Sequence, residues 1–85
     1  METTPRLAAQ ESAVLQALLD CRGRVVSRRE LARLAGIADL NDRRCDSLLV
    51  SIRKVLGADA IRTVRGRGWM LVPVAVDMAE NLLVA

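Results

Sequence analysis

Two arginines that alternate with two glycines form the motif of this sequence with the clearest chemistry. Arg65 and Arg67 flank Gly66, and Gly68 follows. A guanidinium carries forked N–H donors that match the oxygens of a phosphate group. Glycine reaches positive φ without steric cost, so two glycines in four residues favour a tight reversal of the chain. The motif therefore predicts a hairpin tip at which both arginines either bind phosphate groups or only keep the tip solvated.

A second basic group lies between residues 42 and 56, where apolar residues recur at helical spacing. At about 100° per residue, one helix face collects four apolar side chains, namely Cys45, Leu49, Ile52 and Leu56. The opposite face is small and basic and carries Arg43, Arg44, Ser47, Ser51 and Lys54. This face either follows a row of phosphates or is an ordinary solvated surface.

Three further apolar residues of this segment, Leu48, Val50 and Val55, lie outside that stripe. If they are exposed, they form an apolar patch on the helix that suits a protein partner. The alternative is that they are partly buried against the C-terminal end of the chain.

The basic residues are concentrated in the middle of the chain. Residues 22–67 hold twelve basic and five acidic residues, a local net charge of +7, whereas the whole chain carries +3. A block this positive indicates either a partner that bears phosphates or a solvated basic face.

The composition argues against catalysis and against a bound cofactor. The chain has no histidine and no tyrosine, and its two cysteines, Cys21 and Cys45, have the spacing of neither a zinc site nor a disulfide framework. Both fall within apolar helical patterns, so we expect small buried residues in a reducing compartment. There is no P-loop and no complete GxGxxG motif. We therefore expect no enzymatic activity, no metal and no cofactor.

Nothing in the sequence indicates export or membrane insertion. The amino end lacks a basic start followed by an apolar run, and the apolar run over residues 70–76 is interrupted by Pro73. We expect a cytoplasmic protein.

Three helices must position the basic side chains. Pro5 suits the first position of a helix, with Thr4 before it, and Ser27 and Glu30 have the spacing of a capping box. Polar residues 39–42 can cap a further helix, which Gly57 ends. The spacing of apolar residues predicts these helices over residues 5–21, 27–35 and 41–56.

A β-hairpin is expected next, over residues 60–72, because two β-rich runs flank a four-residue loop that carries both arginines. Trp69 fits a core position at its base better than a stacking platform, since such platforms normally use several aromatic residues. Residues 73–85 form an apolar tail, read as a strand end plus a short helix. The sequence thus predicts one domain over residues 1–72, mostly α with a C-terminal β-hairpin.

Three stretches of the chain, residues 23–31, 42–57 and 61–69, carry a family resemblance. In this order they resemble the winged-helix effector domain of the OmpR/PhoB family of response regulators. The third stretch is the most specific, because a Thr-Val-Arg-Gly hairpin followed by a Gly-aromatic pair is close to a signature of the hairpin, or wing, of that family.

The resemblance implies a three-helix winged helix-turn-helix domain that binds double-stranded DNA and regulates transcription. The third helix would lie in the major groove, and the wing arginine would reach the adjacent minor groove. The amino-terminal ends of the first two helices would touch phosphates. By matching position, the DNA contacts would be Arg43, Arg44, Ser47, Leu48, Ser51, Thr63 and Arg65. Lys54 and Arg67 join them as basic residues of the same helix face and wing tip, and Ser27, Arg28 and Arg29 would contact phosphates.

The chain departs from the family pattern at several positions. Leu48 stands where the family usually has a histidine, and Ser51 where it often has a basic residue, which weakens direct readout of bases. Ala8 replaces a common capping threonine, so we expect the first helix to start earlier than usual. Only six residues precede Leu7, so we expect a domain without the receiver domain of the family and without its small sheet before the first helix, and the resemblance does not imply control by phosphorylation.

These departures leave a second hypothesis open. The domain would then contact the transcription machinery or another regulator, through Leu48 and the apolar tail, with weak or no DNA binding. The tail would also serve as the contact of a homodimer, because such regulators often bind paired half-sites.

Overall fold

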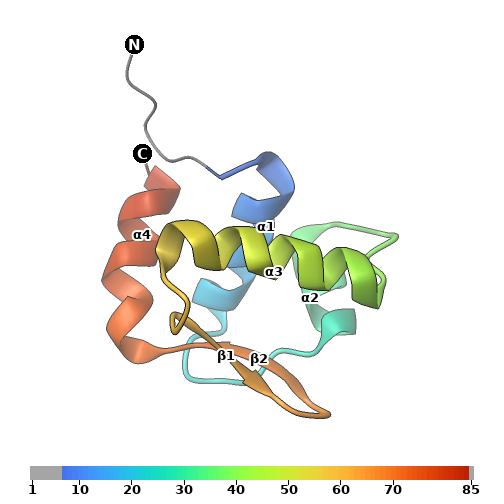
Figure 1. Ribbon diagram of the computed structural model, residues 1–85. Helices are drawn as coiled ribbons and strands as arrows, with labels where there is room; N and C mark the ends of the chain where they lie inside the picture. The colour runs from blue at the N-terminus through green and yellow to red at the C-terminus, as the bar shows by residue number, and fades with distance from the viewer. Residues whose placement is uncertain (1–6, 85) are drawn as a thin grey trace.

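Helices and a hairpin follow one another in the predicted order (Figure 1). The computed structural model describes residues 7–84. Its elements are α1 (Ala9–Asp20), α2 (Arg28–Ala35), α3 (Asp42–Leu56), β1 (Ile61–Val64), β2 (Gly68–Leu71), a short 3-10 turn η1 (Pro73–Ala75) and α4 (Val76–Val84). The prediction of a mostly α fold with a β-hairpin near the C-terminal end is confirmed.

The first helix begins later than predicted. Leu7 and Ala8 are not helical, and Ala8 is the N-cap of α1 with extended backbone angles. The carboxylate of Glu11 accepts a hydrogen bond from the Ala8 N–H at 2.9 Å. This bond satisfies a free backbone donor at the amino end of α1, so the helix can begin at Ala9. The expected earlier start is therefore wrong; its first residues, Thr4 and Pro5, lie outside the described residues.

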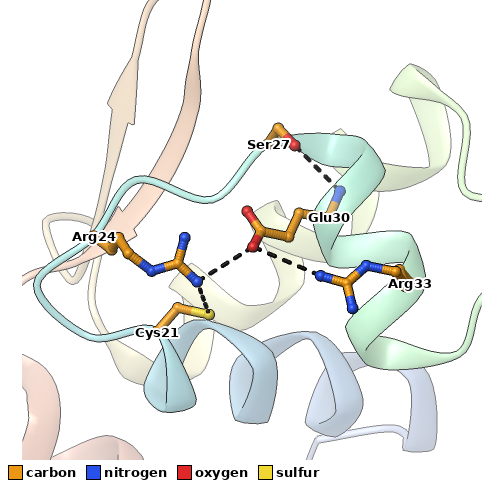
Figure 2. Close-up of polar contacts among 5 residues, drawn as sticks. All are labelled: Cys21, Arg24, Ser27, Glu30 and Arg33. Carbon is orange, nitrogen blue, oxygen red and sulfur yellow. Dashed lines mark hydrogen bonds and ion pairs between the residues drawn. The ribbon is translucent and has the colours of Figure 1, made fainter.

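The other two helices begin within one residue of their predicted starts because local caps hold them. The Ser27 hydroxyl accepts from the Glu30 N–H at 3.1 Å, and the Asn41 side chain accepts from the Arg44 N–H at 2.8 Å. A full capping box would also have the Glu30 carboxylate accept a hydrogen bond from the Ser27 N–H, and this part of the prediction is wrong. The Glu30 carboxylate turns to two guanidinium groups instead, those of Arg24 at 3.2 Å and Arg33 at 3.8 Å (Figure 2).

The core is built around α1, which packs against α2, α3, α4 and β2. The largest fully buried side chains come from α1, α2, α3, β2 and the α1–α2 connection and are Leu15, Leu18, Leu31, Leu49, Ile52, Leu71, Val14, Val26 and Cys45. Cys21 and Cys45 are both buried and free, as the apolar pattern predicts. Because α1 is central, it orients both α3 and the hairpin.

The hairpin is one residue tighter at its tip than predicted. Val64 pairs with Gly68, which leaves a loop of residues 65–67, and the Arg67 N–H donates to the Val64 carbonyl at 2.9 Å. Gly66 has φ of +75° at the reversal, the conformation that glycine was expected to supply.

A third strand-like segment flanks the hairpin. Val26, which lies just before α2, exchanges two backbone hydrogen bonds with Trp69, of 2.7 and 2.9 Å. Trp69 is half-buried against the core, so its assignment to the base of the wing is confirmed. This pairing places β2 between β1 and the segment that leads into α2.

Gly68 makes this close approach feasible. A Cβ atom at this position would lie 2.1 Å from the Val26 carbonyl oxygen, and the φ of Gly68 is +145°. Any side chain would therefore push the Val26 segment away from β2.

The tail is helical where it was expected to be, but it has no strand. η1 replaces the expected strand end, and α4 packs on α1 through the fully buried Ala79. The exposed side of the tail keeps Val74, Met78 and Val84 in solvent.

Replacing Gly68 by alanine should lower the free energy of unfolding by about 3–4 kcal/mol, because the new Cβ adds a backbone clash to a strained φ. Gly66→Ala is the matched control, since it has open space and adds only the conformational strain, about 1–2 kcal/mol. Urea unfolding followed by circular dichroism measures both. Equal losses would mean that the Val26 segment yields without cost.

Candidate nucleic-acid interface

The outward face of α3 is polar and mostly exposed. Arg43, Arg44, Ser47 and Lys54 are exposed, and Ser51 is half-buried. The buried stripe on the other side contains all four apolar residues that the spacing predicted. The side chains of this face are therefore available to an external partner, although their contacts with DNA stay predictions.

Leu48 does not belong to this face. It is only 2% exposed and lies in the apolar core. The reason is helical geometry: Leu48 follows Cys45 by three residues and precedes Ile52 by four, so it shares their side of α3. Its prediction as a DNA-facing residue is wrong, and so is its place in an exposed apolar patch. Val50 is 49% exposed and Val55 is half-buried.

Several of the predicted contact residues already have partners within the chain, among them Arg44 and Arg28. The Arg44 guanidinium donates to the Gln10 side chain, which ties α3 to the start of α1. The Arg28 guanidinium donates to the Leu40 carbonyl and forms an ion pair of 2.8 Å with Asp42. Arg28 thereby links the start of α2 to the start of α3.

The wing loop lies beside these contacts of Arg28. An open groove of about 300 Å³ is lined by Arg28 and Asp42 together with the wing residues Thr63, Val64, Gly66, Arg67, Gly68 and Trp69. Figure 1 shows the tip of the hairpin extending below the amino-terminal half of α3. The amino-terminal ends of α2 and α3 and the wing loop thus share one region of the surface.

Three carboxylates of the domain, those of Glu30, Asp42 and Glu80, form ion pairs. Within residues 7–84, their ion pairs are made with Arg22, Arg24, Arg28 and Arg33. None of these arginines lies on α3 or in the wing. The hydrogen bond to Glu30 raises the pKa of the Arg24 guanidinium. Within the described residues, the basic groups of α3 and the wing therefore form no ion pair, although the exposed Asp42 and Asp46 lie on α3 itself.

Two basic residues that the sequence analysis did not select belong to this region. Arg62 is exposed on β1, beside the wing arginines. Arg53 leaves the last turns of α3 and hydrogen-bonds to β1, at the Ile61 carbonyl and the Thr63 hydroxyl. The alternation of inward and outward side chains along a strand could have identified Arg62 as exposed, whereas no local pattern predicts the contacts of Arg53.

These features define a winged helix-turn-helix protein. The chain matches the family model described as "Transcriptional regulatory protein, C terminal" over residues 2–71. It belongs to this family, the DNA-binding domains of OmpR/PhoB type, which is a family of transcription regulators and not of enzymes. Comparison with curated proteins and with solved structures returned no match.

No helix within residues 7–84 combines the length and apolar character needed to cross a bilayer. Among these residues, no three side chains of the kinds that bind metals lie close enough together to hold an ion. α4 lies beyond the region that matches the family.

Burial controls the chemistry of the one thiol on α3. Removal from water raises the pKa of Cys45 to about 11, and the nearby carboxylate of Asp46 acts in the same direction. The thiol of the unfolded chain ionises near about pH 8.5. The folded state therefore holds the proton more tightly than the unfolded state does.

Protonated Cys45 should therefore contribute to the free energy of unfolding. This contribution should be complete below about pH 8.5 and should be lost as the pH rises through about 11. Cys45→Ala should remove this part of the alkaline loss. Denaturant unfolding at a series of pH values compares the two slopes. Identical slopes for both chains would contradict the assignment to Cys45.

Proposed function

We propose that α3 and the wing bind one DNA duplex together, with α3 in the major groove and the wing on the adjacent backbone or minor groove. The observation that carries the proposal is the distribution of charge. Carboxylates neutralise Arg22, Arg24, Arg28 and Arg33, whereas the basic groups of α3 and the wing have no acidic partner within the described residues. A surface with this excess of positive charge attracts a polyanion.

The roles follow from exposure. Arg43 and Lys54 extend from a face on which Ser47 and Ser51 are short, so the helix can approach the floor of a groove. Arg65 and Arg67 stand on a tight loop and reach phosphates or a narrow minor groove with forked donors. The exposed Arg29, next to the Ser27 cap, adds a phosphate contact at the start of α2.

Some of the predicted contact residues would have to bind DNA with groups that already have partners within the chain. Arg44 already donates to Gln10, Arg28 pairs with Asp42, and the Thr63 hydroxyl accepts from Arg53. Each can still offer a remaining donor to a phosphate, because a guanidinium has five N–H groups and a hydroxyl both donates and accepts. We therefore assign most of the affinity to the uncommitted arginines and lysine.

Binding should depend steeply on salt. If about five phosphates are neutralised, log K should fall against log salt with a slope of about −4 to −5. Replacing Arg65 and Arg67 together by alanine should reduce that slope by about 2 in magnitude, since each phosphate contact contributes about one unit. Fluorescence anisotropy with a labelled duplex at several salt concentrations measures both slopes.

The matched control removes two positive charges elsewhere. Arg22 and Arg33 pair with Glu80 and Glu30, away from the wing loop. The Arg22→Ala, Arg33→Ala chain should keep the slope of the unmodified protein. An equal reduction in both double variants would mean that only net charge matters and that the wing has no contact of its own.

The exposed apolar residues of the tail favour a second candidate function, a contact between two copies of the chain. Val74 is 90% exposed and Met78 is 55% exposed. Both line an open apolar groove of about 310 Å³, together with Leu56 and Val72. Burying these side chains in a dimer would remove apolar surface from water.

Sedimentation should then reveal a dimer whose fraction grows with concentration. Val74→Asp with Met78→Asp should abolish it, because two carboxylates in an apolar contact lose their hydration. Leu34→Asp, at an exposed leucine of α2, is the control and should leave the dimer intact. A monomer at every concentration would dispose of the contact.

A further inference from the structure

The position of the wing relative to α3 depends on few contacts. Close packing joins α1 to both α3 and β2, but α3 is not among the closely packed neighbours of either hairpin strand. Between them, the buried side chain of Ile61 enters the common core. A polar link supplements this apolar contact.

Arg53 supplies that link. Its Nη2 atom donates to the Ile61 carbonyl at 2.7 Å and to the Thr63 hydroxyl at 2.9 Å, and its Nε atom lies 3.3 Å from the same carbonyl. Within the described residues, these are the side-chain hydrogen bonds that join α3 to the hairpin. Two of the donors are fixed in one plane, so the guanidinium sets both the distance and the direction of β1.

This geometry bears on binding because the wing and α3 act on one ligand. A second contact on the same duplex adds affinity only where the linkage allows both contacts at once. A wing that moves freely relative to α3 must be ordered on binding, which takes away part of the gain.

We propose that Arg53 is a positioning residue for DNA binding, which holds the wing at the separation from α3 that one duplex requires. The inference rests on the proposed function, because it concerns the coupling between the two elements of that site. Arg53 acts through β1, and its own contact with DNA is not needed.

The test measures the contribution of the wing in different backgrounds. In the unmodified chain, removing Arg65 and Arg67 should reduce the salt slope by about 2. In an Arg53→Met chain, which keeps an unbranched side chain but no donors, the same removal should reduce the slope by less than about 1. The loss of affinity on removing the wing arginines should shrink in parallel.

Lys54→Met is the matched control, since it removes one positive charge from the neighbouring position of α3. Lys54 is exposed, and its side chain makes no hydrogen bond to the hairpin among the described residues. This variant should bind less tightly but keep the wing contribution of about 2. The contrast separates positioning from loss of charge.

Arg53→Lys is the conservative variant and should restore part of the wing contribution, because an ammonium can reach one acceptor but lacks the planar fork. If Arg53→Met fails to fold by circular dichroism, the Arg53→Lys chain decides alone. A full wing contribution of about 2 in whichever Arg53 variant folds would overturn the inference. Absence of salt-dependent binding by the unmodified chain would instead refute the proposed function, before any Arg53 variant is made.

Discussion

The backbone pairing of Val26 with Trp69 is the constraint on which the arrangement of this domain depends. Two hydrogen bonds of 2.7 and 2.9 Å hold β2 against the segment that leads directly into α2. The strands can approach this closely only because position 68 has no Cβ atom. As a consequence, the wing loop lies beside the amino-terminal ends of α2 and α3, and residues from three distant parts of the sequence share one surface.

The distribution of ion pairs gives this surface its character. Glu30, Asp42 and Glu80 pair with arginines around α2 and the α1–α2 loop. Such exposed pairs contribute little to stability, about 0–1 kcal/mol each. They also leave the basic side chains of α3 and the wing without an ion-pair partner among the described residues, which supports the proposed contact with a polyanion.

The central position of α1 links folding to function. α1 contacts α2, α3, α4 and β2, so burial of its apolar side chains helps to orient α2, α3 and the hairpin, which carry the predicted contact residues. A chain of this size buries only about 60% of its unfolded surface, and its stability is correspondingly modest. α4 adds to the core through Ala79 and so extends the domain beyond the region that matches the family.

Local interactions explain why much of this fold was predictable from the sequence. The caps formed by Ser27 and Asn41 act over three residues, and the glycine at the tip of the hairpin acts at its own position, so short patterns contain their full cause. The charge of the wing and the buried stripe of α3 were readable for the same reason. Contacts between more distant residues were not: Glu30 also pairs with Arg24 of the α1–α2 loop, and Arg53 hydrogen-bonds to Ile61 on the next element. Leu48 was buried because its neighbours on the helix face the core. The sequence by itself determined the elements and their charge, whereas only the tertiary structure decided which side chains remain free, because that depends on what packs across from them.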